Sequence, residues 1–231
     1  MFKITHIPEL RITKNDSLSI DEFRKMDNLA VEEFNLPIEL MMENAGLQLA
    51  RMVAAYATKK DRILIGVGSG NNGGGGLVAA RRLAGWGFSV NLHIPQEPLK
   101  PLVYSQLRRA LAFGAQEGFL NNADIFIDAY LGFSQRLPLS KNYLKAVVTA
   151  DMLTAWKISL DIPSGFDKNS GVLKFRPDVI LTLAVPKKEL LDADIQAEQY
   201  LTDIGFPAEL YQSFGVQQPE FALSSILKLS K

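Results

Sequence analysis

The chain has 231 residues, of which 47% are hydrophobic and 22% charged, proportions typical of a globular protein with a sizeable buried core. Lysine plus arginine and aspartate plus glutamate number 25 each, so no net charge attracts nucleic acid or an anionic membrane. The absence of cysteine excludes disulfides, thiolate catalysis and cysteine zinc sites, and the two histidines argue against a histidine-rich metal centre or a Ser-His-Asp triad.

The N-terminus has no apolar signal region, and no stretch of about 18 apolar residues occurs. We therefore expect a cytoplasmic protein without membrane or nucleic-acid partners. The length fits a single domain over residues 1–231, with residues 1–17 as an irregular N-terminal arm.

Two amphipathic helices are predicted before the first strand. Ser19 and Glu22 form a capping box, in which each side chain accepts a hydrogen bond from the other residue's backbone N–H. Apolar residues then recur at helical spacing up to Phe34, where an Asn and a Pro follow and end the helix. A second helix is predicted over about 39–56.

From residue 62 onward, apolar strands alternate with helices. Strands are predicted at 62–67, 88–94, 125–129, 157–162, 179–184 and 199–204, and helices at 75–86, 101–113, 141–155 and 208–214. This alternation implies a mostly parallel sheet with helices on both faces and right-handed crossovers. The predicted fold class is α/β, a Rossmann-like three-layer α/β/α sandwich with two extra N-terminal helices.

The segment after the strand at 62–67 reads GSGNNGGGG, from Gly68 to Gly76. A strand, a glycine-rich turn and a helix bring backbone N–H groups and a helix N-terminus close to an anionic ligand. Glycine suits this place because a Cβ would block both a positive-φ turn and the approach of a phosphate. Six glycines in nine residues exceed what a turn needs, so we predict a ligand-binding loop.

The residues alone weaken the interpretation of this loop as an ordinary NAD-binding site. Gly68, Gly70 and Gly73 satisfy the dinucleotide fingerprint, but that fingerprint also requires an acidic residue near the end of the second strand, to bind a ribose hydroxyl. That strand offers Asn91 and His93 instead. An NAD(P)-dependent dehydrogenase therefore remains only an alternative, and a Walker A loop is excluded because no Lys-Ser or Lys-Thr follows the glycines.

Two further strands end in polar loops, at 128–134 and 161–167, and ligands of such sheets bind outside the carboxyl ends of the strands. Asp128 and Asp161 each follow an apolar run directly, where a carboxylate is costly without a cation, a donor or a substrate. With an Asn carbonyl and a Ser hydroxyl, they supply hard oxygen donors that suit an alkali or alkaline-earth cation, or a substrate hydroxyl. The three loops are predicted to converge on one crevice.

Four segments of the chain resemble the NAD(P)HX epimerases, also called the YjeF N-terminal domain family. They stand in the family's order and read LMMENAG at 40–46, GSGNNGGGG at 68–76, DAYLG at 128–132 and SLDIPSG at 159–165. A looser similarity is LTLAVPK at 181–187. The resemblance runs from about residue 18 to about residue 215.

The resemblance implies a Rossmann-like fold, a homodimer, and an isomerase of nicotinamide nucleotide repair that interconverts the R and S epimers of NADHX and NADPHX, the cofactors hydrated at C6. It also implies a potassium ion bound by Asn72, Asp128 and Ser164. The substrate-binding residues that it implies are Asn71, Asn72, Gly73, Gly74, Gly75, Gly132, Phe133, Ser134, Gln135, Arg136, Leu137, Pro138 and Asp161. The carboxylate expected to perform acid/base catalysis is Asp161.

The chain departs from the family pattern in two places. The family loop usually reads NNGGDG, and here Gly75 stands at the Asp position. The turn after Asp128 is more often Phe-Gly-Thr-Gly than the Leu-Gly-Phe-Ser at 131–134. A catalytically impaired nucleotide-binding or interaction module of the same fold is therefore the second alternative. The separate dehydratase domain of many bacterial relatives has no counterpart here, so we expect no ATP- or ADP-dependent dehydration.

Overall fold

The sheet and its helices occupy residues 7–230, the part of the chain that the computed structural model describes. The strands are, in chain order, Glu9–Arg11 (β1), Arg62–Val67 (β2), Ser89–His93 (β3), Gln116–Glu117 (β4), Ile125–Ala129 (β5), Trp156–Leu160 (β6), Val179–Leu183 (β7), Glu198–Thr202 (β8) and Ile226–Ser230 (β9). The α-helices are Ile20–Glu32 (α1), Ile38–Tyr56 (α2), Asn71–Gly85 (α3), Pro101–Ala112 (α4), Lys141–Asp151 (α5), Lys188–Asp192 (α6) and Ala208–Ser213 (α7).

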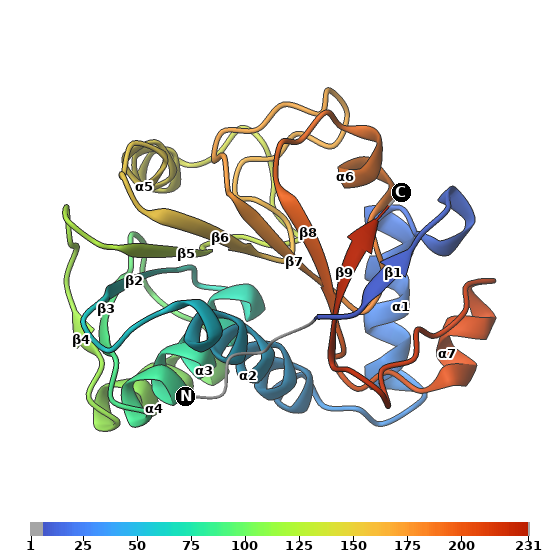
Figure 1. Ribbon diagram of the computed structural model, residues 1–231, viewed down its shortest axis with the longest axis horizontal. Helices are drawn as coiled ribbons and strands as arrows, with labels where there is room; N and C mark the ends of the chain where they lie inside the picture. Colours follow the sequence, from blue (N-terminus) through green and yellow to red (C-terminus); the bar gives the residue numbers. More distant parts are fainter. Residues whose placement is uncertain (1–6, 231) are drawn as a thin grey trace.

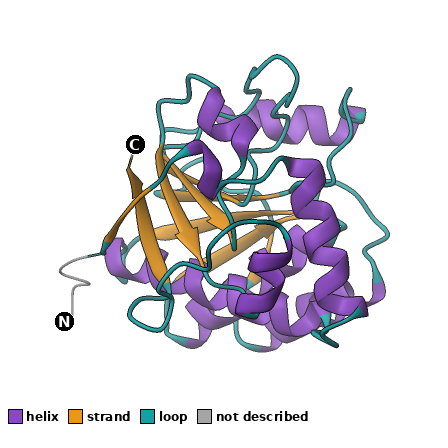
Figure 2. Ribbon diagram, turned by 90° about the vertical axis from the view of Figure 1, so that its right-hand side faces the viewer, coloured by secondary structure: helices purple, strands orange, loops and turns teal. Residues whose placement is uncertain are grey.

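The nine described strands form one sheet in the order β1-β9-β8-β7-β6-β5-β2-β3-β4. Every neighbouring pair is parallel except β8 and β9. Helices α2, α3 and α4 cover one face and α5 and α6 the other (Figure 1), and the strands lie between the two helix layers in the second view (Figure 2). The predicted α/β class with its mostly parallel sheet and three layers is therefore confirmed.

The chain order of the sheet reverses between β2 and β5, which are neighbours. From β2 the chain continues to β3 and β4 on one side, and from β5 it continues to β6, β7 and β8 on the other. The loops after β2 and β5 therefore leave in opposite directions and open a crevice at the carboxyl ends of the strands. The register pairs Gly66 with Asp128, and Asp128 with Ser159, so the predicted loops begin side by side.

Helix α1 shows how local sequence sets an element boundary. The Ser19 N–H donates to Glu22 Oε2 over 2.8 Å, and the Glu22 N–H donates to Ser19 Oγ over 3.2 Å, which forms the predicted capping box. Phe23, Met26 and Ala30 are buried at helical spacing. The helix ends before Asn35, which adopts a positive φ of 50°.

Helix α3 begins at Asn71, inside the glycine run, and the predicted start at residue 75 is wrong. The four glycines at 73–76 form its first turns, where close neighbours leave no room for side chains. A Cβ on Gly73 would lie 2.0 Å from Gly68 O, one on Gly74 would lie 2.4 Å from Met42 Sδ of α2, and one on Gly76 would lie 2.5 Å from Ala129 Cβ of β5. None of the glycines from 68 to 76 has a positive φ, so the expected positive-φ turn is also wrong.

The N-terminal arm is not irregular throughout. Glu9–Arg11 pair in parallel with β9, a short 3-10 helix follows at Lys14–Asp16, and residues 1–6, with His6, lie outside the described part of the chain. Strands β4 and β9 and helix α6 are two to five residues long and were not predicted from the sequence. Such short segments contain too few residues for a periodic pattern, and pairing with the existing sheet decides their conformation. That residues 1–231 form a single domain stays a prediction.

Within residues 7–230, the helices are too short or too polar for any of them to cross a membrane.

The close contact of α3 with the sheet predicts the effect of one added methyl group. Gly76→Ala should lower the free energy of unfolding by about 1–3 kcal/mol, because the new Cβ overlaps Ala129 and the helix must shift. Gly70→Ala is the matched control, since a Cβ there would meet no heavy atom within 4 Å and should change stability by less than about 0.5 kcal/mol. Urea unfolding of both variants measures the difference. Equal midpoints would show that the glycine is not required for packing.

Candidate functional site

A cavity of about 240 Å³ lies where the chain order of the sheet reverses. All three predicted loops contribute to its wall. The predicted substrate-binding residues that line it are Asn71, Asn72, Gly75, Gly132, Phe133, Ser134, Gln135 and Asp161. A larger hollow of about 540 Å³ beside α6 includes no residue of these loops, so the smaller cavity is the candidate site.

Five residues expected to bind substrate lie outside the cavity lining. Gly73 and Gly74 face the packing contacts of α3 described above. Arg136 and Pro138 are exposed, and Leu137 lines a separate hollow next to Arg24 and Phe166. Contact between these five residues and a substrate stays a prediction.

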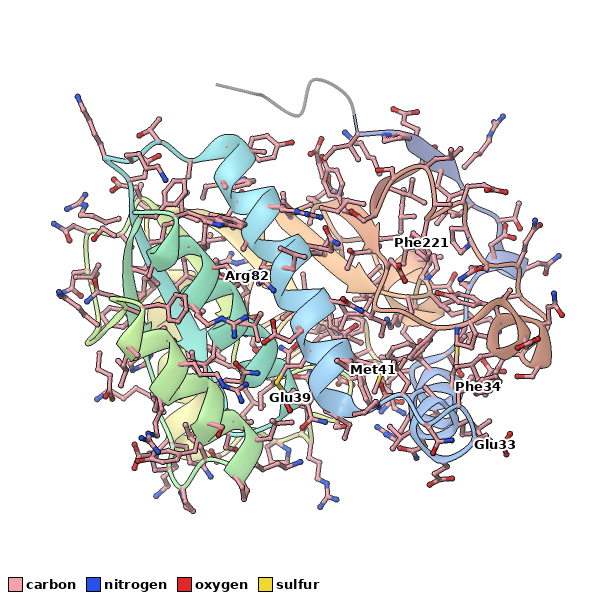
Figure 3. The ribbon with its side chains drawn as sticks, turned by 90° about the horizontal axis from the view of Figure 1, so that it is seen from below. Glu33, Phe34, Glu39, Met41, Arg82 and Phe221 are labelled. Carbon is pink, nitrogen blue, oxygen red and sulfur yellow. The ribbon has the colours of Figure 1, made fainter. Side chains whose placement is uncertain are left out.

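The lining also contains residues that the sequence analysis did not select. Seven of them are apolar and lie outside the three predicted loops: Ile38, Met41, Met42, Ala45, Leu160, Leu183 and Ile204. Met41 lies at the N-terminal end of α2, with α1 on one side (Figure 3). The segment at 40–46 resembled the family, but its sequence did not indicate a role. In the structure, Met41, Met42 and Ala45 of this segment form part of the cavity lining. The lining also contains two charged residues, Asp27 of α1 and Lys100, which immediately precedes α4, together with Ser69, Gly70, Tyr130 and Leu131.

Asp128 is fully buried in β5, and hydrogen bonds surround its carboxylate. It accepts from Ser159 Oγ over 2.9 Å, from the Ser164 N–H over 2.8 Å, from Ser164 Oγ over 2.6 Å and from the Tyr130 N–H over 3.3 Å. Burial raises the pKa of Asp128 to about 6, although these hydrogen bonds favour the ionised form. The carboxylate therefore has protein partners that its position in the sequence did not reveal.

The three predicted cation ligands meet around the backbone of Leu131. The Asn72 side-chain amide donates to Leu131 O over 2.9 Å, and the Leu131 N–H donates to Ser164 Oγ over 3.0 Å. Ser164 Oγ in turn donates to Asp128. Within residues 7–230, no cluster of three or more His, Cys, Asp or Glu side chains could hold a metal. The groups that do converge are the Asn72 amide, whose nitrogen faces Leu131 O, the Ser164 hydroxyl, the Leu131 carbonyl and the single carboxylate of Asp128.

Asp161 follows β6 with a φ of 68°, in the left-handed region that side chains rarely adopt. Its side chain is buried at 1% exposure, and Oδ2 accepts a hydrogen bond from the Phe133 N–H over 3.2 Å. Oδ1 lies 3.0 Å from Lys187 Nζ, outside hydrogen-bond geometry, and has no hydrogen-bond partner among the described residues. A strained backbone that persists at a cavity wall is typical of a functional position.

Lys187 is a fully buried cation at the back of this site. Its ammonium lies 3.0 Å from Asp161 Oδ1, donates to Leu183 O over 2.6 Å and stands 3.6 Å above the ring of Phe23. Burial lowers the pKa of Lys187, while Asp161 opposes that shift. The weak similarity at 181–187 ended on this residue without indicating its partner, because β7 and the loop after β6 meet only in the folded sheet.

The turn after β5 is fastened to the loop after β6. Gln135 Nε2 donates to Pro163 O over 3.2 Å, and the Gly165 N–H donates to Gln135 Oε1 over 2.6 Å. With the Phe133 hydrogen bond to Asp161, these contacts fix the two loops against each other. The side of the cavity that carries Asp161 is therefore held together by hydrogen bonds within the protein.

Gly75 lies in α3 and lines the cavity. A Cβ built there would lie 3.0 Å from Leu160 Cδ2 and 4.0 Å from Ala45 Cβ. Its φ is not positive, so the backbone accepts a side chain, provided that the end of Leu160 moves by a few tenths of an ångström. A carboxylate at this position would add a negative group next to the cavity.

The chain is similar to several known proteins. Residues 38–189 match the family model described as YjeF-related protein N-terminus. A protein of Dehalogenimonas lykanthroporepellens named NAD(P)H-hydrate epimerase is 34% identical over 77% of this chain and 77% of its own length, and one of the same name from Rhodopirellula baltica is 33% identical over 89% and 86%. The crystal structure of yeast ynu0 superposes with a TM-score of 0.82 at 23% identity, over 92% of this chain and 99% of the yeast chain.

The family match spans more than half of the chain and includes the glycine run, both aspartates and Lys187. The same residues line or support the cavity at the reversal of the sheet. By its sequence match, this chain belongs to the family of YjeF-related protein N-termini.

Proposed function

We propose that this protein is an NAD(P)H-hydrate epimerase, which interconverts the R and S forms of hydrated NADH and NADPH. The observation that supports this most directly is the position of Asp161. Its buried carboxylate, held by Lys187, stands in a cavity whose other walls come from the asparagines of α3 and the turn after β5. Two relatives above 30% identity over most of this chain carry the name of that activity.

The chemistry requires the features that the cavity provides. Changing the configuration at C6 means breaking and remaking the C6–O bond, or opening and reclosing the ring, and either route needs proton transfer and compensation of developing charge. Asp161 is the acid/base group of the proposal. Lys100, the cationic side chain among the cavity-lining residues, lies where it can meet a phosphate of the dinucleotide.

The dehydrogenase alternative receives no support from the residues at the end of β3. That strand presents His93 where a dehydrogenase needs a carboxylate for the ribose. His93 Nδ1 instead lies 2.5 Å from Tyr130 OH, and burial lowers the pKa of its ring. The impaired-module alternative rests on Gly75 alone, and turnover distinguishes it from the enzyme.

A potassium ion completes the proposal. Asn72, Leu131 and Ser164 bring neutral oxygen donors together beside one carboxylate, which suits a hard ion of low charge. A half-turn of the Asn72 amide would set its oxygen against Leu131 O, and a cation between the two would compensate both. Such an ion would hold Asn72, Asp128 and Ser164 in place and polarise nearby groups weakly. A homodimer and a cytoplasmic location stay predictions of the family resemblance.

Turnover with R-NADHX tests the proposed activity. The purified protein should produce the S epimer, and Asp161→Asn should slow this by about 10²–10⁴-fold, because one positioned acid/base group is lost. Since Asp161→Asn leaves Lys187 buried without its counter-charge, Asp161→Asn combined with Lys187→Met is the matched variant without an unpaired charge. Chromatographic separation of the epimers measures the rate. Wild-type turnover in the folded double variant would exclude Asp161 from catalysis.

The potassium site predicts a salt-specific stability. Potassium should raise the melting temperature more than sodium or tetramethylammonium at equal ionic strength, because the ion binds only the native state. Asp128→Asn should remove that difference. Asp124→Asn, at the opposite end of β5 and paired with Arg62, should keep it. Identical melting curves of the unaltered protein in the three salts would rule out the site.

Restoring the family carboxylate should increase turnover. In Gly75→Asp, the first turns of α3 favour the ionised side chain, which can share proton transfer with Asp161. We expect a gain within the about 10²–10⁴-fold that one acid/base group contributes. Gly75→Ala is the control, since it adds the same contact with Leu160 without the carboxylate and should show no gain. If the two variants turned over at the same rate, the missing Asp would not limit catalysis.

A further inference from the structure

The cavity contains a second carboxylate that the proposed function does not use. Asp27 of α1 lines the same cavity as Asp161 and is half-buried. It makes no hydrogen bond and no ion pair with any other residue in the described range 7–230. A carboxylate that faces a cavity without a protein partner is placed to meet a ligand.

The position of Asp27 on the inward face of its helix does not stabilise the fold. It lies four residues after Phe23 and three before Ala30, both buried, so it shares the inward face of α1. The exposed carboxylates of this helix, such as Glu32, lie on the other side. Burial of a carboxylate costs free energy unless a partner compensates it. The cation that interacts with the Asp27 carboxylate is Lys187, and its ammonium is already bound to Asp161 and to Leu183 O.

Two carboxylates therefore share one buried ammonium. The charged groups that interact with Asp27 are Asp161, after β6, and Lys187, before α6. Lys187 compensates one negative charge, and its contact at 3.0 Å assigns that charge to Asp161. Burial, reinforced by Asp161, raises the pKa of Asp27 to about 6, so Asp27 exchanges its proton near neutral pH. The cavity thus contains two carboxylates: Asp161 is paired with Lys187, and Asp27 can carry a proton.

We propose that Asp27 is a second catalytic carboxylate, which exchanges a proton with the C6 hydroxyl of the substrate in concert with Asp161. This inference rests on the proposed epimerase activity. Loss of the hydroxyl from one face of C6 needs a proton donor and addition of water to the other face needs a proton acceptor, and two carboxylates can divide these roles. Asp27 of α1 and Asp161 of the loop after β6 line the same cavity, so both can reach a substrate bound there.

The step conserves atoms and charge. Protonated Asp27 gives its proton to the C6 hydroxyl, the C6–O bond breaks, and water leaves while the N1 lone pair forms an N1=C6 double bond. Water then adds to the other face of C6, the π pair returns to N1, and ionised Asp161 accepts the proton that the water loses. The reverse reaction exchanges the roles of Asp27 and Asp161. Nothing is oxidised or reduced.

Asp27→Asn tests the inference, because Asn has the shape of the protonated carboxylate and cannot transfer a proton. We expect the epimerisation rate of R-NADHX to fall by about 10²–10⁴-fold. NADP⁺ binding measured by calorimetry should stay unchanged. The melting temperature at pH 7 should not fall, because a folded-state pKa raised from 3.8 to about 6 makes ionised Asp27 unfavourable for the fold above pH 6. Glu32→Gln is the matched control on α1 and should retain the wild-type rate.

The pH profile separates a catalytic role from a structural one. In the unaltered protein, the rate should fall as the pH rises through about 6, where Asp27 loses its proton, and Asp27→Asn should lack this limb. In H₂¹⁸O, the product should take up label at the rate of epimerisation. Asp27→Ser, with the same expectations, replaces the Asn variant if the latter does not fold.

The outcomes distinguish this inference from the proposed function. In one outcome, the unaltered protein converts R-NADHX and Asp27→Asn has the same rate and the same pH dependence. That result would overturn the role of Asp27 and would leave the proposed epimerase activity unaffected. Epimerisation without uptake of ¹⁸O would overturn the C6–O step. Failure of the unaltered protein to convert R-NADHX would overturn the proposed function and, with it, the role of Asp27.

Discussion

The close approach of helix α3 to the sheet and to α2 is the constraint on which the site depends. Glycines at 73, 74 and 76 let the helix begin directly over the end of β2, against Met42 of α2 and Ala129 of β5. Larger residues would push its first turn away from the strand ends. Asn71 and Asn72 would then no longer reach the turn after β5, to which Asn72 is bound through Leu131 O. Packing of glycine therefore sets the position of the polar groups.

Asp128 and Asp161 are equally buried, but different groups in the protein compensate their charges. Asp128 is held by hydrogen bonds from serines and from backbone N–H groups, and it ties the loops after β5 and β6 together. Asp161, three residues before Ser164, takes its compensation from the ammonium of Lys187 and leaves one oxygen without a hydrogen bond. The hydrogen bonds of Asp128 join two loops, whereas Asp161 stands at the wall of the cavity with one oxygen free of hydrogen bonds. The loop after β6 thus contains both Ser164, which binds the buried Asp128, and Asp161, which lines the cavity.

The charged groups at the cavity come from distant parts of the chain. Asp27 belongs to a helix that precedes the doubly wound part of the fold, and Lys187 follows β7. The N-terminal helices are therefore part of the site, because α1 contributes Asp27 and α2 contributes four apolar residues to the lining of the cavity. In this arrangement the ammonium of Lys187 pairs with Asp161, and burial raises the pKa of Asp27, which has no ion-pair partner among the described residues.

The sequence by itself determined the class of fold, because apolar periodicity and helix capping are local properties. Alternating strands and helices from residue 62, the capping box at Ser19 and the order of the motifs required no knowledge of distant contacts. It also selected Asp128 and Asp161, since a carboxylate after an apolar strand is conspicuous in one dimension. The start of α3 was misplaced because glycine is a poor helix former, and only contact with Met42 and Ala129 explains a helix there.

Only the tertiary structure decided how the charges are paired. Asp27, Asp161 and Lys187 are separated by 134 and 26 residues along the chain, and no local pattern connects them. The pairing of β1 with β9 was equally hidden, because a three-residue strand acquires its conformation from its neighbour. Periodicity reports which face of an element is buried, but the partner of a buried polar group depends on which elements the sheet places side by side.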